Sequence, residues 1–449
     1  MSIDRRQFIA TTAAGATMLA AVPVAAAPLS KFGLNAAGFG VRAGSLDDQS
    51  RALQRAIDRA AKTRSPLVLE PGVYRAGNLT LPAGAAIIGV RGATRLMLSE
   101  GPSLIAVHRS SRVSLTGLVL DGGGQPLPQG RGLVQIGATT GLRIADCEIV
   151  RAGGIGIALD ASDGEVTGTV IANAADTALF SNNGRGLIIA GNVIRKSGNG
   201  GIRIWQSDQR DDGSKIFDNS IEDTAARAGG SGQNGNAINV FRAANVIVRG
   251  NHIRNAAFSA IRGNAASNIQ IVGNNCSALD EVALYSEFGF EGAIIADNVV
   301  DGAGVGISVT NFNDGGRLAS VRGNIVRNVS PRRPETPAGE EGIGISVEAD
   351  TAVTGNVIEA AANAGISAGW GKYLRNVAVT GNVVRKAGYG VAVSVVPGAG
   401  GAVIASNLIA GARRGAIVGM EYRTVMTGDL AVKGARRYPQ IKIDGNQIA

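Results

Sequence analysis

The stretches Gly191-Asn192-Val193-Ile194, Gly250-Asn251-His252-Ile253, Gly323-Asn324-Ile325-Val326, Gly355-Asn356-Val357-Ile358 and Gly381-Asn382-Val383-Val384 are near copies of one another. Asn219, Asn274, Asn298, Asn407 and Asn446 head weaker copies, and the pattern extends back to Thr169, Cys147 and Leu118. From Asn192 onward, successive asparagines lie 23 to 39 residues apart. A repeat of this length that contains strands and turns, but no helical period, is typical of one coil of a β-solenoid.

The second half of each unit is an apolar stretch with alternating side chains, such as Gly201-Ile202-Arg203-Ile204. Because successive side chains of a strand point to opposite faces, we expect Ile202 and Ile204 to face inward and Arg203 to face outward. Each coil then stacks in parallel on the next. The sequence therefore predicts an all-β fold, a single-stranded parallel β-helix of about a dozen coils.

The repeated asparagine has a structural explanation. Glycine and asparagine both tolerate the left-handed backbone that a tight corner requires, and stacked asparagine amides can hydrogen-bond from coil to coil as a ladder. We therefore expect these asparagines to support the fold and not to take part in catalysis.

Composition agrees with one long body. Glycine accounts for 65 of the 449 residues and aromatic residues for only 4%. Such a mix suits thin buried strands joined by tight turns and disfavours a helical bundle. Because one pattern runs through the chain, the length counts coils and not separate domains.

The amino terminus is typical of an export signal. Arg5-Arg6-Gln7-Phe8-Ile9 precedes an alanine-rich apolar run over residues 10–27. This arrangement resembles a twin-arginine signal peptide, predicted over residues 1–26, which would engage the twin-arginine export machinery and leave residues 27–449 in the periplasm or outside the cell. The alternative is a membrane anchor, but the run is short and lacks positive residues after it, so we expect no stable membrane span.

A capping helix is predicted over about residues 45–64. Ser45 and Asp48 form a start that is similar to a capping box, and Leu53, Ala56 and Ile57 fall on one helical face. Such a cap would cover the unpaired strand edge at the end of a solenoid. We expect the coils to follow over about residues 67–449.

The run Asp47-Asp48-Gln49-Ser50 and the run Leu67-Val68-Leu69-Glu70-Pro71-Gly72-Val73-Tyr74 resemble the start of pectin-lyase-like right-handed parallel β-helices. With the twin-arginine start and the repeated coils, nearly the whole chain resembles an uncharacterised family of twin-arginine-exported β-helix repeat proteins. The resemblance implies the fold and the compartment. It implies activity, as a polysaccharide lyase or glycoside hydrolase, only by analogy, because one fold hosts many functions.

The formal net charge is +9. A basic exported protein suits a polyanionic partner, and an acidic polysaccharide fits that compartment better than nucleic acid, for which no basic run or stacking motif is present. The alternative is that the excess charge only maintains solubility. The two cysteines, Cys147 and Cys276, are predicted to lie five coils apart, on the order of 24 Å, so we expect no disulfide between them.

Aligning the outward strands predicts where chemistry gathers. An inward column is followed by two outward columns, which carry Arg203, Asn239, Arg262, Leu284, Ser308, Ser346 and Ser367 and, two positions later, Trp205, Phe241, Asn264, Ser286, Thr310, Glu348 and Gly369. The inward residue predicted for the coil at residues 282–287 is Ala283. Three long steps of the repeat, which hold residues 208–215, 229–236 and 330–341, are expected to form loops that wall a groove.

Two reactions suit such a groove. For β-elimination, Arg203, Arg262, Lys215 and Tyr285 are candidates for neutralising a uronate and for abstracting its proton. For hydrolysis, the candidate carboxylates are Asp208, Glu287 and Glu348.

For sugar binding, the candidates are Trp205, Phe241, Tyr285 and Trp370 as stacking platforms, with Asn239 and Lys215 as polar contacts. No cofactor is predicted, although the acidic stretch from Asp208 to Asp212 leaves calcium open. The alternative is a solenoid that binds polysaccharide or another surface through the same face without catalysis.

Overall fold

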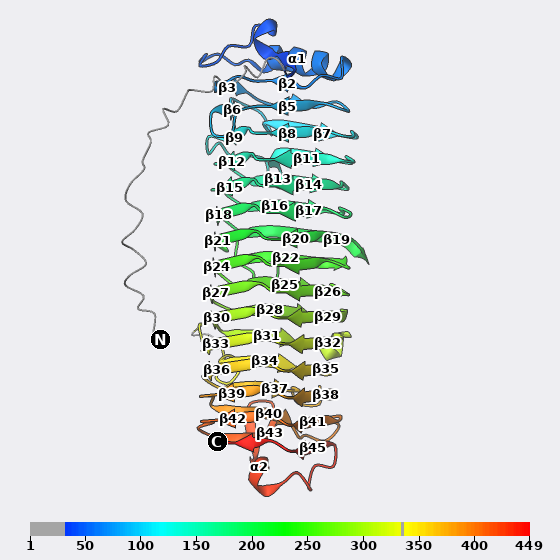
Figure 1. Ribbon diagram of the computed structural model, residues 1–449, viewed down its shortest axis with the longest axis vertical. Coiled ribbons are helices and arrows are strands. Elements are labelled where there is room, and N and C mark those ends of the chain that lie inside the picture. The colour runs from blue at the N-terminus through cyan, green and yellow to red at the C-terminus, as the bar shows by residue number, and fades with distance from the viewer. Residues whose placement is uncertain (1–31, 334–335) are drawn as a thin grey trace, which may run out of the picture.

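The computed structural model describes residues 32–333 and 336–449. The predicted signal peptide lies outside the described residues. Three parallel sheets run the length of the molecule and carry 16, 15 and 15 strands. Figure 1 shows the coils stacked along one long axis, and the predicted all-β parallel solenoid is confirmed.

Each coil contributes one strand to each sheet in turn. We call sheet A the one that contains β17 (Ile188–Ala190), sheet B the one that contains β18 (Val193–Ser197), and sheet C the one that contains β19 (Gly200–Asp211). The next coil supplies β20 (Lys215–Phe217), β21 (Ser220–Thr224) and β22 (Asn236–Ala244) to the same sheets. Residues about one coil apart in sequence therefore become neighbours along the axis.

Sheet C forms the floor of the region described below. Its other strands are β4 (Leu79–Thr80), β7 (Ile105–His108), β10 (Gly132–Gly137), β13 (Ile155–Asp160), β16 (Thr177–Asn182), β25 (Ile261–Asn264), β28 (Val282–Glu287), β31 (Val305–Val309), β34 (Ile343–Val347), β37 (Ala364–Ala368), β40 (Tyr389–Ser394), β43 (Gly415–Glu421) and β44 (Thr424–Asp429). Only the last pair, β43 with β44, is antiparallel.

The asparagine ladder is confirmed. Asn192 Nδ2 donates to Asn219 Oδ1 at 2.9 Å, Asn219 repeats this bond to Asn251, and the series continues as far as Asn446. The left-handed backbone belongs to the residue before each asparagine, as at Gly191 with a φ of 63°, and not to the asparagine itself. The two residues of the repeat therefore have different tasks: glycine makes the corner and asparagine joins the coils.

The end of the solenoid is covered by α1 (Ser50–Lys62), which Figure 1 shows at the amino-terminal end of the stack. The helix starts later than predicted, and the predicted capping box is wrong. Asp48 accepts from the Ser50 backbone N–H at 3.1 Å, while the N-cap residue Gln49 turns its side chain to Arg42. Leu53, Ala56, Ile57 and Ala60 are buried, as the helical face predicted.

Both cysteines are buried and free. Burial raises the pKa of the Cys147 thiol to about 11 and that of the Cys276 thiol to about 12. Cys147 occupies the ladder position, whereas Cys276 lies two residues beyond it, in β27 (Asn275–Leu279). Both act as small core residues.

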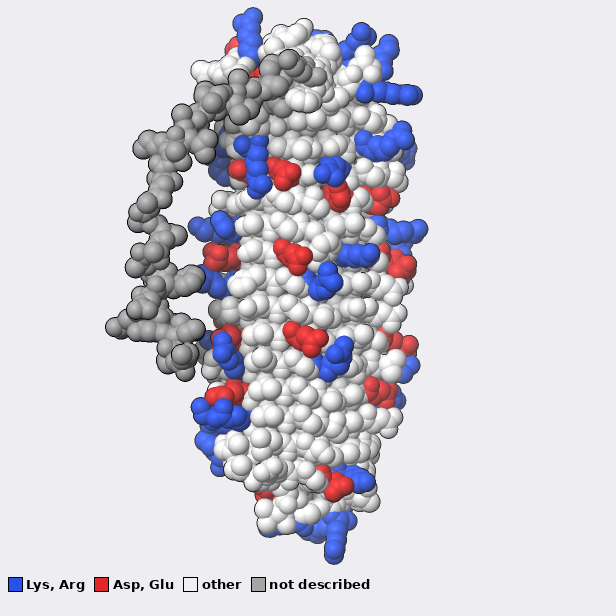
Figure 2. Space-filling model, in the orientation of Figure 1, with Lys and Arg blue, Asp and Glu red and all other residues white. Residues whose placement is uncertain are grey.

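Charged side chains on the face seen in Figure 2 gather in neighbouring blue and red groups, with broad uncharged surface between them. Ion pairs between adjacent coils are frequent in the molecule, for example Arg327 with Asp301 at 2.9 Å and Arg385 with Glu359 at 3.1 Å. The positive excess therefore forms no single large block on this face. Within the described residues, no helix has the length and apolar character needed to span a membrane.

Candidate functional site in the sheet C groove

Two corners of the coil supply walls for sheet C. At the corner where sheet B turns into sheet C, two long segments project: residues 225–235, and the segment between β33 (Ile325–Val329) and β34. The extended end of β19 and the short helix η3 (Phe312–Asp314) leave the opposite corner, after sheet C. The predicted loops therefore flank the predicted strip from both sides.

The predicted alignment of the strip is wrong by one residue in one coil. In β28, Leu284 and not Ala283 pairs with Ile261 and Ile307 in the inward column. Tyr285 therefore stands next to Arg262 in the first outward column, and Glu287 stands next to Asn264 in the second. Leu284 fills the core because it is the larger apolar residue, and the shift brings two predicted site residues onto the strip itself.

Arg262 and Glu287 form a buried ion pair. Arg262 Nε donates to Glu287 Oε1 at 2.7 Å and Nη2 donates to Oε2 at 2.9 Å, while Nη1 donates to the Ser231 carbonyl at 2.8 Å. Burial disfavours the charged guanidinium, but Glu287 and Glu281 outweigh that effect and raise the pKa of Arg262. The cation predicted to hold a substrate carboxylate already holds a protein carboxylate.

Arg203 is also buried and engaged, at 7% exposure. Its Nη2 donates to the Asn199 carbonyl at 3.0 Å and to Asn234 Oδ1 at 2.8 Å. Burial lowers the pKa of this guanidinium, although Asp176 partly offsets the effect. Arg203 thus pins the loop at residues 225–235 down onto sheet C.

Trp205 and Phe241, two of the predicted sugar-stacking residues, line a hollow on sheet C. Trp205, Asn239 and Phe241 form one side of a space of about 320 Å³, and Gly230 and Gly232 of the loop form the other. The Trp205 indole N–H donates to Asn239 Oδ1 at 2.7 Å, and its ring lies edge-on to Phe180 and Phe241, with centroids 5.1 and 5.7 Å away. We call this space the Trp205 hollow.

A larger hollow, of about 450 Å³, lies further along sheet C under the segment that joins β33 and β34. We call it the Glu348 hollow. The residues that matter for its chemistry are Glu281, Tyr285, Arg333, Glu341, Glu348 and Trp370. With Glu340, which is paired with Arg423, the lining carries four acidic side chains and one guanidinium, so it is richer in acidic groups than the basic protein as a whole.

Glu348 is the distinctive carboxyl of this hollow. It follows β34, is 7% exposed, and its Oε2 accepts a hydrogen bond from the Phe312 backbone N–H at 2.7 Å. No ion pair to Glu348 is found among residues 32–333 and 336–449. Burial raises its pKa to about 7, and backbone hydrogen bonds from Phe312 and Asn311 only partly oppose this. This carboxyl therefore titrates near neutral pH and keeps its proton below about pH 7.

The other two buried carboxylates are paired. Glu341 accepts from the Arg332 backbone N–H at 2.6 Å and from Arg333 Nε at 3.0 Å, and such bonds outweigh burial and lower its pKa. Glu281 lies 3.4 Å from Arg262 and 3.3 Å from Arg333, and burial still raises its pKa. The hollow thus combines Glu348, whose pKa is raised to near neutrality, with Glu341, whose pKa is lowered by its partners, a contrast that is typical of acid and base sites.

Trp370 lines both the Glu348 hollow and a neighbouring one of about 350 Å³. The Trp370 ring lies edge-on to Tyr422 at 5.5 Å between centroids, and Tyr389 stands across the second hollow with the Arg414 guanidinium 4.2 Å from its ring centroid. On the other side, Tyr285 lies 4.9 Å from the Arg262 guanidinium, and burial raises the pKa of its phenol. Aromatic walls of this kind suit sugar rings.

Family and structural comparisons agree on the architecture. The family described as right handed beta helix region matches residues 99–221. The catalytic unit of the thermostable GH87 alpha-1,3-glucanase from Streptomyces thermodiastaticus strain HF3-3 aligns over 94% of this chain and 70% of its own, with a TM-score of 0.51 and 16% identity.

The pre-mature gene product 12 of bacteriophage phi29 aligns over 87% of this chain and 64% of its own, with a TM-score of 0.51 and 14% identity. The chain is a right-handed parallel β-helix. At these identities the likeness shows the fold of the β-helix alone. No curated protein sequence matches it.

Five predicted site residues line neither hollow: Arg203, Arg262 and Glu287 are buried in contacts within the protein, and Lys215 and Asp208 are exposed elsewhere. Lys215 is exposed on β20, in sheet A, because the coil has already turned the corner before it. Asp208 is exposed on the projecting end of β19. Neither lines the Trp205 or the Glu348 hollow.

The acidic stretch from Asp208 to Asp212 does not fit calcium. Asp212 is buried and accepts from Gln206 Nε2 at 2.6 Å and from the Ser214 backbone N–H at 3.0 Å, while Asp211 accepts from Asn245 at 2.7 Å. In the described part of the chain, no three His, Cys, Asp or Glu side chains are grouped so that they could hold a metal ion.

Sequence reasoning missed Glu281, Arg333 and Glu341 as site residues. Glu281 precedes a strand and lies outside the alternating columns, so the column alignment does not reach it. Arg333 and Glu341 lie in the long step at residues 330–341. That step was the available signal, because it marked a loop next to the strip.

Proposed function

We propose that this β-helix is a glycoside hydrolase that binds a polysaccharide along sheet C and cleaves it in the Glu348 hollow, with Glu348 as the general acid. The observation that supports it is the position of Glu348: a buried carboxyl without an ionic partner in the described residues, facing a walled hollow that carries other carboxylates. A general acid must hold a proton at working pH and stand next to the leaving group.

Glu281 is the proposed second carboxylate. Glu341 already accepts from Arg332, Arg333 and Thr336, whereas Glu281 lines the hollow and has longer contacts to Arg262 and Arg333. Those two arginines favour its ionised form. In hydrolysis Glu348 would protonate the glycosidic oxygen, while Glu281 would take a proton from the attacking water.

Elimination is less well supported. A lyase needs a cation that is free to neutralise the substrate carboxylate. Arg203 and Arg262 are buried and already donate to protein oxygens, and Lys215 lies on sheet A. The acidic lining of the Glu348 hollow also favours a neutral sugar unit at the point of cleavage. An acidic polysaccharide, favoured by the net charge, would need its anionic units to bind elsewhere on the protein.

The test uses the full chain on neutral glucans and on polyuronates, with reducing ends and the ultraviolet absorbance of unsaturated products measured in parallel. Reducing ends are expected without absorbance. Glu348→Gln should lower turnover on the order of 10²-fold or more with little change in binding. Matched loss of binding and turnover, or full activity in Glu348→Gln, would contradict the assignment. Absorbance would point to elimination, and binding without either signal to the non-catalytic alternative.

Export also remains a proposal. We propose that residues 1–26 direct the folded chain through the twin-arginine machinery to the periplasm or beyond, on the strength of the Arg5-Arg6 pair and the apolar run after it. Replacing both arginines by lysine should retain the protein in the cytoplasm, as measured by fractionation. Export of that variant at the normal level would exclude the proposal.

A further inference from the structure

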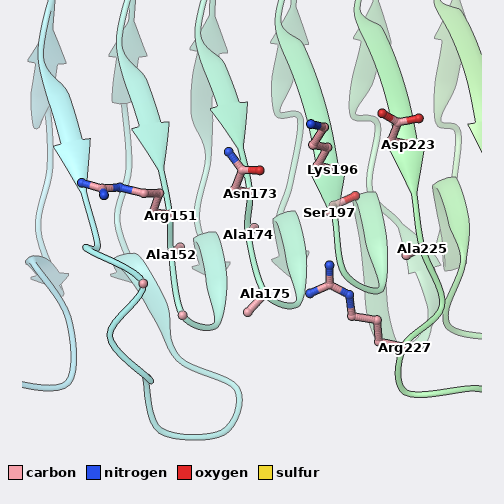
Figure 3. Close-up of a pocket in the computed structure, with 12 residues that line it drawn as sticks. Arg151, Ala152, Asn173, Ala174, Ala175, Lys196, Ser197, Asp223, Ala225 and Arg227 are labelled. Carbon is pink, nitrogen blue, oxygen red and sulfur yellow. The ribbon is translucent and has the colours of Figure 1, made fainter.

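A second groove lies at the corner where sheet B turns into sheet C, nearer the amino-terminal end than the Glu348 hollow. It measures about 490 Å³. Small residues form its floor, including Gly153, Ala174 and Ala175, and long polar side chains form its rim. Figure 3 shows Arg151, Asn173, Lys196 and Asp223 following one another from coil to coil, with Ala174 and Ala175 beside them. We call it the Lys196 groove.

The rim is basic. It carries Arg151, Lys196 and Arg227 against a single carboxylate, Asp223, which accepts from Asn255 Nδ2 at 2.6 Å. Arg151 is bound to the buried Asp121, with its Nε 3.0 Å from Asp121 Oδ1. No ion pair to Lys196 or Arg227 is found in the described residues, and both side chains are exposed.

The corner holds these side chains in a row along the axis. Arg151, Asn173, Lys196 and Asp223 occupy the same left-handed position in four successive coils, with φ values from 53° to 59°. Arg151 and Lys196 are two coils apart, roughly 9.6 Å at ~4.8 Å per coil. Arg227 comes one coil later, where its backbone N–H donates to the Gly198 carbonyl at 3.0 Å. Lys196 lies in this column, next to Asp223, whereas Arg227 lies off the column, further round the corner in the coil that carries Asp223.

The same position in a later coil carries a lysine that is paired with a carboxylate, unlike Lys196. Lys386 occupies the same column, but its Nζ lies 2.9 Å from Glu359, and the neighbouring Arg385 contacts that carboxylate at 3.1 Å. A cation at this corner is thus neutralised in one place and left without a carboxylate partner in another.

We propose that the Lys196 groove binds a stretch of an acidic polysaccharide, whose sugar carboxylates lie against Lys196 and Arg227. Charge complementarity favours an anionic ligand, because Lys196 and Arg227 are exposed in adjacent coils of one groove and no ion pair to either is found in the described residues. The residues lining the groove include no aromatic side chain on which nucleic-acid bases could stack, so a carbohydrate polymer is favoured over a single-stranded nucleic acid.

The inference deepens the proposed function, since it rests on the partner being a polysaccharide. Lys196 and the Glu348 coil are five coils apart, about 24 Å along the axis, with Lys196 at the corner before sheet C and Glu348 at the far end of β34 in that sheet. One long polymer can therefore reach both places, and retention at the groove would raise its local concentration at the hollow.

The experiment measures binding of polygalacturonate, of a neutral glucan and of oligo(dT) at low and high salt. All proteins carry Glu348→Gln, so that turnover does not interfere. Lys196→Ala with Arg227→Ala should weaken polygalacturonate binding about tenfold at low salt and flatten its salt dependence. The matched control, Arg385→Ala with Lys386→Ala, removes the same two charge types from the same corner and should bind as the parent does.

Equal loss in both double variants, or none in the first, would overturn the inference. Tighter binding of oligo(dT) than of polygalacturonate would overturn it as well. The two proposals can fail separately. If the Lys196→Ala, Arg227→Ala variant loses polygalacturonate binding but the unmodified chain hydrolyses nothing, the groove proposal stands and the hydrolase proposal is rejected. If the unmodified chain hydrolyses polysaccharide but the variant binds polygalacturonate normally, the hydrolase proposal stands and the groove proposal is rejected.

Discussion

Glu348 Oε2 accepts a hydrogen bond at 2.7 Å from the backbone N–H of Phe312, a residue of the preceding coil. The bond positions the carboxyl across two coils but supplies no full positive charge. Burial therefore prevails, and the pKa of Glu348 rises to about 7. The protonation of the proposed acid thus depends on the stacking of two coils, which buries Glu348 and gives it a neutral hydrogen-bond donor in place of a cation.

The first prediction concerns the pH dependence of turnover. Because a general acid must be protonated, the rate should fall as the pH rises through about 7. The measurement is kcat against pH on the cleaved polysaccharide. The residual rate of Glu348→Gln should lack this limb, and a limb that persists in the variant would assign it to another group.

The second prediction concerns stability. The pKa of Glu348 is about 7 in the folded chain against an ordinary value of 4.5, so the folded state binds this proton more tightly than the unfolded state. The stabilising contribution is complete below about pH 4.5 and is lost as the pH rises through about 7, at a cost of about 3 kcal/mol. Urea unfolding at pH 5 and pH 8 should show this loss in the parent and not in Glu348→Gln. A parallel pH dependence in both proteins would contradict the assignment.

The third prediction concerns the ladder. Asn324 donates to Asn356 Oδ1 and to the Ile295 carbonyl, both at 2.9 Å, and accepts from Asn298. Replacing it by alanine leaves buried groups without partners and should cost about 3 kcal/mol of unfolding free energy. The exposed Asn313→Ala is the control and should be close to neutral. If both variants lose the same unfolding free energy, the asparagine ladder does not stabilise the fold as proposed.

The fold was predictable from the sequence because the residues that make the corners and join the coils recur once in each coil. Gly191 and Asn192 recur where a left-handed corner and a buried amide are required, and Asp218, Asp297 and Ser406 take the place of the glycine only in the weaker copies. The number of coils was underestimated, since the first strands of each sheet precede the asparagine series.

The site was only partly predictable. In the stretch from Val282 to Glu287, both alternating sets of side chains contain apolar residues, so the pattern alone does not say whether Ala283 or Leu284 faces inward. Sequence also does not show that Arg262 and Glu287 neutralise each other, because that depends on the packing of adjacent coils. Glu348 and Trp370 were predicted, but the loop residues that enclose them were not.

The fourth prediction separates structure from catalysis at Arg262. Removing it alone leaves Glu287 buried without its partner, so Arg262→Ala should cost about 3–5 kcal/mol. The double variant Arg262→Met with Glu287→Gln keeps the volume and removes both charges, and should recover much of that loss in urea unfolding. If the folded double variant retains turnover, the pair is structural. If it folds and is inactive, Arg262 takes part in turnover, either on the substrate, as the sequence predicted, or by keeping Glu281 ionised.

The fifth prediction compares the two tryptophans. Trp205 has its indole N–H bound to Asn239 and its ring packed against Phe180 and Phe241, so its surface is largely used within the protein. Trp370 lines two hollows and contacts Tyr422 on one side. If sugar rings stack at the point of cleavage, Trp370→Ala should raise KM about tenfold with a smaller change in kcat, since aromatic contacts of this kind contribute about 1 kcal/mol or more. Trp370→Phe should restore most of the affinity, whereas Trp205→Ala should change KM little. The reverse order would move the binding track to the Trp205 hollow, about five coils from Glu348, and would leave the Glu348 hollow without a bound sugar to protonate.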